Sequence, residues 1–280
     1  MLWRPPFDAR LQRWKRVTII AGFQCQEGIL LCSDTEESIS ETSKSQVRKV
    51  PYFRIGKMVV AIGGAGDAVL IDYVTQDLVK YLNSSPRQWG TIENELKEYA
   101  RKIFREYVRP WSGFPVQFVP SAEFLIAISM DDRAHLFQWQ RNHLHLVVPP
   151  QNTSIGIGTI QSQRLISEIQ GDLPYNQTLF FAIRIMQTVK RLVPGCGGKT
   201  ETIFLGHKGF ITWSGTFKID EIEHLVDECD EFVARHILTF ISDTQDHAPT
   251  NIDSVLNSYK DALINLRKKY SDMRADAKLL

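Results

Sequence analysis

Three polar side chains near the start of this sequence are of types that suit acyl transfer. Thr18 stands in the first apolar run, Asp34 ends the next one, and Lys49 follows in the stretch Val-Arg-Lys-Val. A hydroxyl is a weak nucleophile and needs a base within hydrogen-bond reach. An ammonium beside it favours the alkoxide as it develops, and a carboxylate holds that ammonium in place. The three types together indicate a hydroxyl nucleophile supported by an ion pair.

The base is the part of this chemistry that the side chains around Thr18 do not supply. No His or Glu in the surrounding motif region is spaced to accept the hydroxyl proton. If Thr18 were the first residue of a processed chain, its own α-amine, whose reference pKa is about 8, could accept it at neutral pH. The same nitrogen is a non-basic amide in the unprocessed chain. The chemistry therefore requires removal of residues 1–17.

The spacing of apolar residues predicts blocks of strands and helices that must position these groups. Short β-branched and apolar runs predict strands at 17–23, 29–34, 47–55, 58–62, 123–130, 135–140, 143–148, 202–205 and 210–213. Helical spacing predicts helices at 67–82, 92–108, 161–169, 174–192, 220–242 and 252–273. This order lacks strict βαβα alternation. It favours an α+β fold with two stacked antiparallel sheets and helix pairs outside them.

The motifs of residues 17–68 resemble the proteasome β-subunit family of N-terminal-nucleophile (Ntn) hydrolases. In that family a catalytic Thr opens the first strand, a Gly follows four residues on, and an Asp ends the second strand. Thr18, Gly22 and Asp34 keep those spacings, and Lys49 fits the family's Lys with one residue fewer after Asp34 than usual. The element order extends the resemblance to about residue 215. It implies a four-layer αββα sandwich, here with an added C-terminal helical pair.

The resemblance also implies roles for small residues. Gly63, in a strand-to-helix stretch without the Rossmann glycine spacing, corresponds to the Gly whose backbone N–H donates to the oxyanion. Ser38 corresponds to a position that pairs with substrate backbone, and Ala61 and Ala65 to positions lining the specificity pocket. The family acts on peptides within a ring of like or related subunits. The resemblance thus implies a peptide substrate, a homo-oligomer or related proteasome-like partners, and no cofactor.

The sequence departs from the family pattern at positions that support the nucleophile. Val17 precedes Thr18 where active members usually have Gly, and Ile157 replaces the Ser of a supporting Ser-Gly pair. Val193 and Cys196 replace the Asp and Ser of a later Asp-x-x-Ser-Gly-Gly element. Two function classes therefore stay open: a threonine-type peptidase, and a non-catalytic subunit with a role in assembly. A third, narrower possibility is an amidase acting on a small molecule.

We expect the chain to have three parts. Residues 1–17, which are rich in Arg and Lys, would be an N-terminal extension or propeptide. Residues 18–218 would form the proteasome-like domain, and residues 219–280 a helical extension packing on the sandwich or on a neighbouring subunit.

The bulk composition argues against several partners. Thirty-three basic and 32 acidic residues leave a net charge of +1, so no global charge favours nucleic acid or an anionic membrane. No apolar run of about 18 residues predicts a transmembrane helix, and the N-terminus lacks the apolar region of a signal peptide. Four cysteines without a C-x-x-C pair fit a reducing compartment, and we expect a cytoplasmic protein with buried thiols.

Two other motifs fit ligand sites less well. The stretch 197–200, Gly-Gly-Lys-Thr, ends like a phosphate-binding loop, but Val193 occupies the first Gly position and a helix precedes it where a strand is needed. His143 and His145, with His135 on the neighbouring strand, fit the solvated face of a half-buried strand better than a metal site. We therefore expect no metal.

Overall fold

The computed structural model describes residues 15–16, 18–38, 44–84, 87–140, 146–149, 152–169, 171–209, 211–214 and 216–242, and single positions between 257 and 268. The chain divides into two units, Met1–Ser214 and Gly215–Leu280. The first unit contains both main sheets and four of the five α-helices found among the described residues.

One sheet contains the hairpin whose ends lie at Thr18 and Asp34. Strands β2 (Ile19–Cys25) and β3 (Gly28–Asp34) pair in antiparallel register, and Thr18 directly precedes β2. The sheet order is β11-β2-β3-β12-β13. The outer strands are β11 (Thr153–Gly156), β12 (Thr200–Gly206) and β13 (Ile211–Ser214).

The second sheet is built around a long glycine-rich strand, β7 (Met58–Asp67). The sheet order is β1-β7-β8-β9-β10, and β6 also pairs with β7. A separate two-stranded ribbon joins β4 to β5. The bounds are β1 (Lys15–Arg16), β4 (Glu36–Ser38), β5 (Lys44–Gln46), β6 (Tyr52–Ile55), β8 (Ala122–Met130), β9 (Arg133–Trp139) and β10 (Leu146–Val147). All these strand pairs are antiparallel, so the predicted α+β class with two antiparallel sheets is confirmed.

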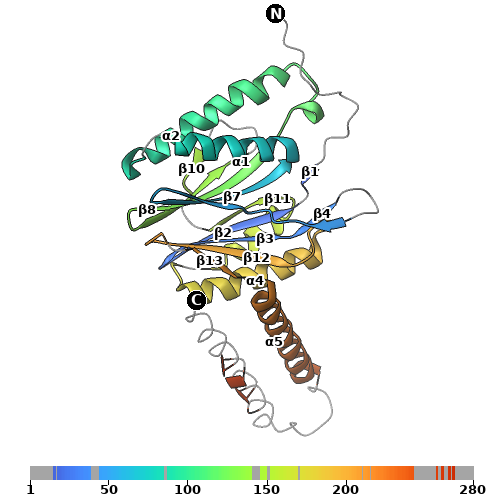
Figure 1. Cartoon of the computed structure of the whole chain (residues 1–280). Helices are drawn as coiled ribbons and strands as arrows, with labels where there is room; N and C mark the ends of the chain where they lie inside the picture. Colours follow the sequence, from blue (N-terminus) through green and yellow to red (C-terminus); the bar gives the residue numbers. More distant parts are fainter. Residues whose placement is uncertain are drawn as a thin grey trace, which may run out of the picture. The chain divides into compact units, whose positions relative to one another are not determined.

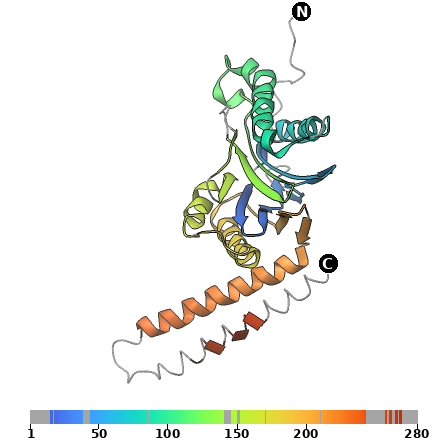
Figure 2. The ribbon, with the colours of Figure 1, turned by 90° about the vertical axis from the view of Figure 1, so that its left-hand side faces the viewer.

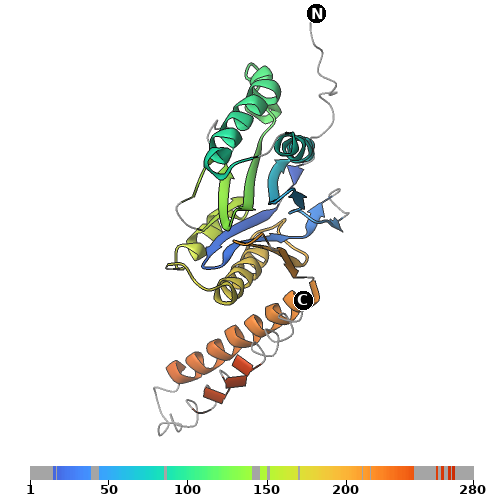
Figure 3. The same ribbon diagram turned by 60° about the vertical axis from the view of Figure 1, so that its left-hand side comes forward.

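The two sheets stack on each other through a continuous apolar layer. Ile20 and Leu31 of the first sheet pack in one buried cluster with Val59, Leu125 and Leu136 of the second. Such side chains alternate along each strand with residues that face away from the neighbouring sheet. Figure 1 and Figure 3 show the two sheets lying one over the other.

Helices cover the outer face of each sheet. Helices α1 (Ala68–Asn83) and α2 (Trp89–Ile103) share a buried cluster with β7, β8 and β9. On the other sheet, α4 (Tyr175–Leu192) contacts β2 and β3, and α3 (Thr159–Ile166) contacts α4 and β11. Figure 2 shows the two helix pairs on opposite sides of the stacked sheets.

Several elements differ from those the sequence predicts. Helix α2 ends at Ile103 and continues as a π-helical turn (Phe104–Val108) and a 3₁₀ turn (Arg109–Trp111), in which Pro110 has no N–H to continue an α-helical ladder. Strand β11 was not predicted, since Thr-Ser-Ile-Gly is short and mostly polar. Strands β1, β4 and β5, which are two or three residues long, were not predicted either. His143 and His145 lie outside the described residues.

The second unit begins with one long helix, α5 (Thr216–Ser242), where the sequence predicts a helix at 220–242. The described positions between 257 and 268, within the second predicted helix, are all helical. None of the described helices is both long enough and apolar enough to cross a membrane.

Leu136 offers a test of the layer between the sheets. It is fully buried, and its Cδ2 lies 2.8 Å from where a Cβ on Gly22 would stand. We expect Leu136→Ala to lower the free energy of unfolding by about 2–5 kcal/mol, because it opens a cavity between the sheets. Leu192, 64% exposed at the end of α4, is the matched control, and Leu192→Ala should cost less than about 0.5 kcal/mol. Equal effects of the two substitutions in urea titrations would contradict this packing.

Candidate active site

The hydroxyl of Thr18 is hydrogen-bonded to the carboxylate of Asp34. The hairpin β2–β3 returns the chain to its starting point, so the residue before β2 meets the residue that ends β3. Thr18 Oγ1 donates to Asp34 Oδ1 at 2.5 Å, and the backbone N–H of Ile19 donates to the same oxygen at 3.1 Å. Both side chains are completely buried.

Lys49 completes the set from the segment that precedes β6. Its Nζ lies 3.0 Å from Asp34 Oδ1, and neither side chain of this ion pair is exposed to solvent. Nζ also donates to the backbone carbonyl of Glu36. The ammonium and the Thr18 hydroxyl therefore share one carboxylate oxygen. The structure brings together the three polar residues that the sequence singled out.

The second oxygen of Asp34 is held by the segment before β12. The backbone N–H of Gly197 donates to Asp34 Oδ2 at 3.2 Å. Next to it lies Cys196, whose pKa is raised to about 12 by burial first and by the Asp34 carboxylate second. The thiol is consequently neutral at physiological pH. It stands where the family pattern has a Ser, and it is no rival nucleophile to Thr18.

The backbone of Thr18 is fixed by the end of β11. Ile157 N–H donates to the carbonyl oxygen of Thr18 at 3.0 Å, and Gly156 pairs with Ile19. Gly156 has a φ of +100°, and a Cβ there would lie 2.2 Å from the same carbonyl oxygen. Only glycine allows this approach. Ile157, which replaces the family's Ser, supports Thr18 through its backbone while its side chain is 52% exposed.

One edge of β7 has a gap beside these residues. Strand β8 pairs along one edge of β7. Along the other edge, β6 pairs only as far as Ala61, and β1 pairs only with Gly66 and Asp67. No described strand pairs with Gly63, Gly64 or Ala65 at that second edge. Ile62 N–H donates toward the β6 side, to Pro51 O at 3.0 Å. Since successive N–H groups of a strand point to opposite edges, the N–H of Gly64 faces the gap and that of Gly63 faces β8.

The remaining small residues take different places. Gly63 lies between the sheets, where a Cβ would stand 2.9 Å from Ile20 Cγ2. Ala61 and Ala65 are buried in the same layer, and Ala65 Cβ is 3.3 Å from the Cβ position of Gly156, next to Thr18. Ser38 ends β4 and opposes Lys44 of β5.

Sequence reasoning did not single out Glu123, a carboxylate close to this set. Glu123 Oε2 accepts the N–H of Gly156 at 3.0 Å, and its residue pairs with Ala65 across β7 and β8. It lies 105 residues after Thr18 in the sequence, and only the strand register brings it near. An acidic residue at the otherwise apolar start of β8 is the one signal that the sequence offers.

Solved structures with the same fold were found by comparison. The chain shares its fold with Anbu, an ancestral β-subunit. Anbu from Yersinia bercovieri gives a TM-score of 0.60 at 12% identity, over 82% of this chain and 99% of that one. Anbu from Hyphomicrobium sp. strain MC1 gives 0.62 at 12% identity, over 82% and 100%. The Pseudomonas aeruginosa Anbu complex, described as a helical assembly, gives 0.64 at 11% identity, over 83% and 99%.

The likeness to Anbu confirms, at the level of the fold, the resemblance to proteasome β-subunits seen in the sequence. No protein-family model matches the sequence, and no curated protein matches it either.

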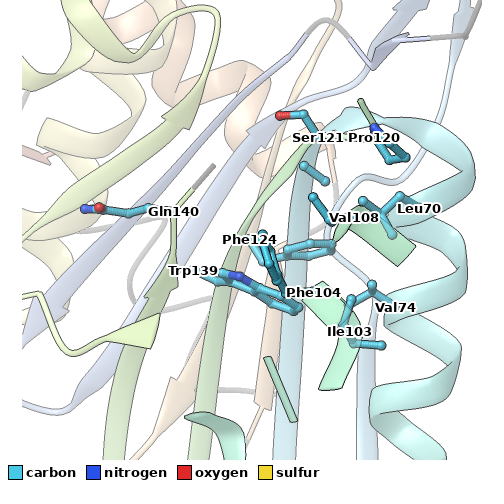
Figure 4. Close-up of a pocket in the computed structure, with 11 residues that line it drawn as sticks. Leu70, Val74, Ile103, Phe104, Val108, Pro120, Ser121, Phe124, Trp139 and Gln140 are labelled. Carbon is cyan, nitrogen blue, oxygen red and sulfur yellow. The ribbon is translucent and has the colours of Figure 1, made fainter. Parts of the chain in front are cut away.

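A small cavity lies apart from the candidate site. It holds about 20 Å³, room for about one water molecule, and is lined mainly by apolar side chains between α1, the π-helical turn and β8. Figure 4 shows Val74, Phe104, Phe124 and Trp139 around it. None of the candidate site residues lines this cavity. Among the described residues, no group of three or more His, Cys, Asp or Glu is placed to hold a metal ion.

The ion pair gives a direct test of the site's geometry. Asp34→Asn removes the charge that Lys49 faces at 3.0 Å inside the protein. We expect unfolding free energy to fall by about 3–5 kcal/mol, and the double change Asp34→Asn with Lys49→Met to recover much of it. Glu98→Gln is the control, because its pair with Arg101 is more than half exposed and should matter by less than about 1 kcal/mol. A double variant no more stable than Asp34→Asn in urea unfolding would contradict the coupling.

Proposed function

We propose that this chain is a proteasome-like threonine-type peptidase whose nucleophile is Thr18, made active by removal of residues 1–17. The observation that carries the proposal is the fully buried, hydrogen-bonded set of Thr18, Asp34 and Lys49 at the start of β2. The Anbu-like fold supports it at the coarser level of a proteasome β-type subunit. The αββα stack would accordingly be of the Ntn-hydrolase type.

The proposed reaction uses the α-amine that processing would expose. This amine accepts the proton of Thr18 Oγ1 while the oxygen attacks the substrate carbonyl carbon. The amine then gives a proton to the leaving nitrogen as the amide bond breaks, which leaves an ester on Thr18. Water, activated by the same amine, hydrolyses this ester and regenerates the enzyme. Lys49 stabilises the negative charge that develops on Oγ1, and Asp34 holds Lys49 in place.

Backbone donors and small side chains would bind the substrate. The resemblance implies Gly63 as the oxyanion donor, but the N–H that faces the gap beside β7 is that of Gly64, so the oxyanion would accept from Gly64. Ala61 and Ala65 would line the pocket for the side chain before the cleaved bond, and Ser38 would pair with substrate backbone. The catalytic set would then be Thr18, Asp34, Lys49 and Gly64, without a metal or cofactor.

A non-catalytic subunit is the second candidate. Val17 is stiffer than the Gly that usually precedes the nucleophile, and the hydroxyls that support it in the family pattern are Ile157 and Cys196 here. In this reading the set of Thr18, Asp34 and Lys49 is an inherited structural element. The chain would serve assembly.

We further propose that the chain works as an oligomer in the cytoplasm. It would have an extension at 1–17, a peptidase-type domain at 18–218 and a helical extension at 219–280. Helices on both outer faces of the sandwich offer surfaces for neighbouring copies. Whether such contacts close into a ring or continue as a helix depends on the rotation between neighbours, and one Anbu complex is described as a helical assembly.

The peptidase proposal predicts a processed N-terminus. Intact mass of active protein should match a chain beginning at Thr18, and its peptide hydrolysis should rise with pH through the α-amine pKa of about 8, because only the neutral amine accepts the proton. Thr18→Ala and Lys49→Ala should each remove most of the rate, since members of such a unit act together. A chain beginning at Thr18 that folds and assembles yet hydrolyses no member of a broad peptide library would favour the assembly role.

The oligomer proposal predicts a mass in solution well above one chain. Light scattering at micromolar concentration should give a multiple of the 32.1 kDa monomer. The Thr18→Ala variant should give the same multiple, because the substitution lies inside the domain and not on its surface. A single monomer peak for both proteins would count against self-association.

A further inference from the structure

The candidate nucleophile would become a chain terminus on the proposed processing, and a terminus needs contacts that hold it. The ends of a chain are poorly ordered unless they are tied down. Asp34 accepts from the Thr18 hydroxyl and from the N–H of Ile19, and the carbonyl oxygen of Thr18 accepts the N–H of Ile157 at 3.0 Å. The bond from Ile157 is thus the contact that holds the main chain of Thr18 to the end of β11.

The direction of the Ile157 N–H depends on the residue before it, Gly156. This glycine has a φ of +100°, and glycine has more conformational freedom to lose on folding than any other residue. Because peptide units are planar, the rotations about the Gly156 Cα decide where the next N–H points. Anchors on both peptide units beside this Cα would therefore fix the donor that holds Thr18.

Side chains anchor both peptide units beside Gly156. The unit before its Cα donates its N–H to Glu123 Oε2 at 3.0 Å. The unit after its Cα accepts, at the carbonyl oxygen of Gly156, the hydroxyl of Thr159 at 2.7 Å. This second unit also carries the N–H of Ile157. The bonds from Glu123 and Thr159 together therefore hold the conformation of Gly156.

Glu123 provides its anchor from the other sheet. It lies on β8, whereas Gly156 belongs to β11 of the first sheet. Leu125 and Ala127, the next residues on the same face of β8, are buried in the apolar layer between the sheets. A carboxylate at the end of such a layer is costly unless it is hydrogen-bonded, and a charged acceptor makes a stronger bond than a neutral one. The bond to Gly156 thus joins the two sheets next to Thr18.

We propose that Glu123 is a positioning residue of the candidate site. Its carboxylate sets the conformation of Gly156, and Gly156 in turn directs the N–H of Ile157 at the main chain of the nucleophile. Support of this kind comes from backbone groups, so it works with Ile157 in the position where the family pattern has a Ser. The consequence for catalysis rests on the proposed function, because it takes Thr18 as the nucleophile.

Two substitutions of Glu123 separate the length of the side chain from its charge. Glu123→Gln keeps an oxygen at the same distance from the main chain, so the residue can still accept the Gly156 N–H. Glu123→Asp keeps the charge but is shorter by one C–C bond of about 1.5 Å, which moves the acceptor out of hydrogen-bond range. Positioning therefore ranks Gln above Asp. A role that depends on charge alone ranks Asp above Gln.

Hydrogen exchange on the full-length Thr18→Ala chain measures the positioning without catalysis. We expect the Ile157 amide to exchange about tenfold faster with Glu123→Asp and within about twofold of the parent rate with Glu123→Gln. Glu27→Asp is the matched control, because Glu27 also accepts a backbone N–H, that of Tyr175 at 2.8 Å, at the other end of the β2–β3 hairpin. An Ile157 amide that exchanges no faster with Glu123→Asp than with Glu27→Asp overturns the proposal.

Peptide hydrolysis by a chain beginning at Thr18 extends the test to the reaction. Glu123→Asp should lower kcat about 10- to 100-fold and change KM by less than about twofold, because a displaced nucleophile weakens the transition state rather than substrate binding. Glu123→Gln should recover most of the kcat that Glu123→Asp loses, and Glu27→Asp should leave both constants unchanged. An Asp variant as active as the Gln variant, or a loss confined to KM, overturns the positioning role.

The two measurements also separate this proposal from the proposed function. If the parent chain hydrolyses no peptide while the Ile157 amide still exchanges faster with Glu123→Asp than with Glu123→Gln, the proposed function fails. The role of Glu123 in positioning the main chain of residue 18 then stands.

Discussion

The buried ion pair between Asp34 and Lys49 is the interaction on which the arrangement of the candidate site depends. Taking two charges out of water costs several kcal/mol each unless their hydrogen-bonding capacity is satisfied. Asp34 meets this condition by accepting from Thr18 Oγ1, Ile19 N–H, Lys49 Nζ and Gly197 N–H. These donors come from three segments far apart in the sequence. The carboxylate therefore fixes the start of β2, the approach to β6 and the approach to β12 relative to one another.

The stacked sheets supply the dry surroundings in which that ion pair is strong. Thr18 and Asp34 lie at one end of the apolar layer between the sheets, where Ile20 packs against the backbone of Gly63. Glycines allow this approach on both sides: Gly63 admits Ile20, and Gly156 admits the carbonyl of Thr18. A larger residue at Gly63 would push β2 away from β7, and one at Gly156 would push the start of β2 away from β11. The same close approaches therefore determine both how the sheets pack and where the candidate nucleophile lies.

Local patterns in the sequence predict much of this fold, and long-range register accounts for what they miss. The hairpin of β2 and β3, α1 and α4 follow from period-two and helical spacing within each segment. The Thr18, Asp34 and Lys49 set was found through motif spacing. Glu123 and strands β1 and β11 were not, because each is defined by its partner across the sheet and carries almost no signal of its own. The direction of the Gly64 N–H likewise depends on which strand lies at each edge of β7.

In the proposed peptidase, one covalent bond would control both the chemistry and the access to it. While residue 17 is attached, the Thr18 nitrogen is an amide, the Thr18 hydroxyl is completely buried, and β1 covers the end of the β7 edge. Breaking that bond would create the amine that can act as base and would also free β1 from its covalent anchor at Thr18. Under the proposed mechanism, such a site would be inactive before processing for two independent physical reasons. Val17 is β-branched and therefore stiff where self-cleavage would need a strained backbone. Whether the bond after Val17 is cleaved therefore distinguishes a peptidase from a purely structural subunit.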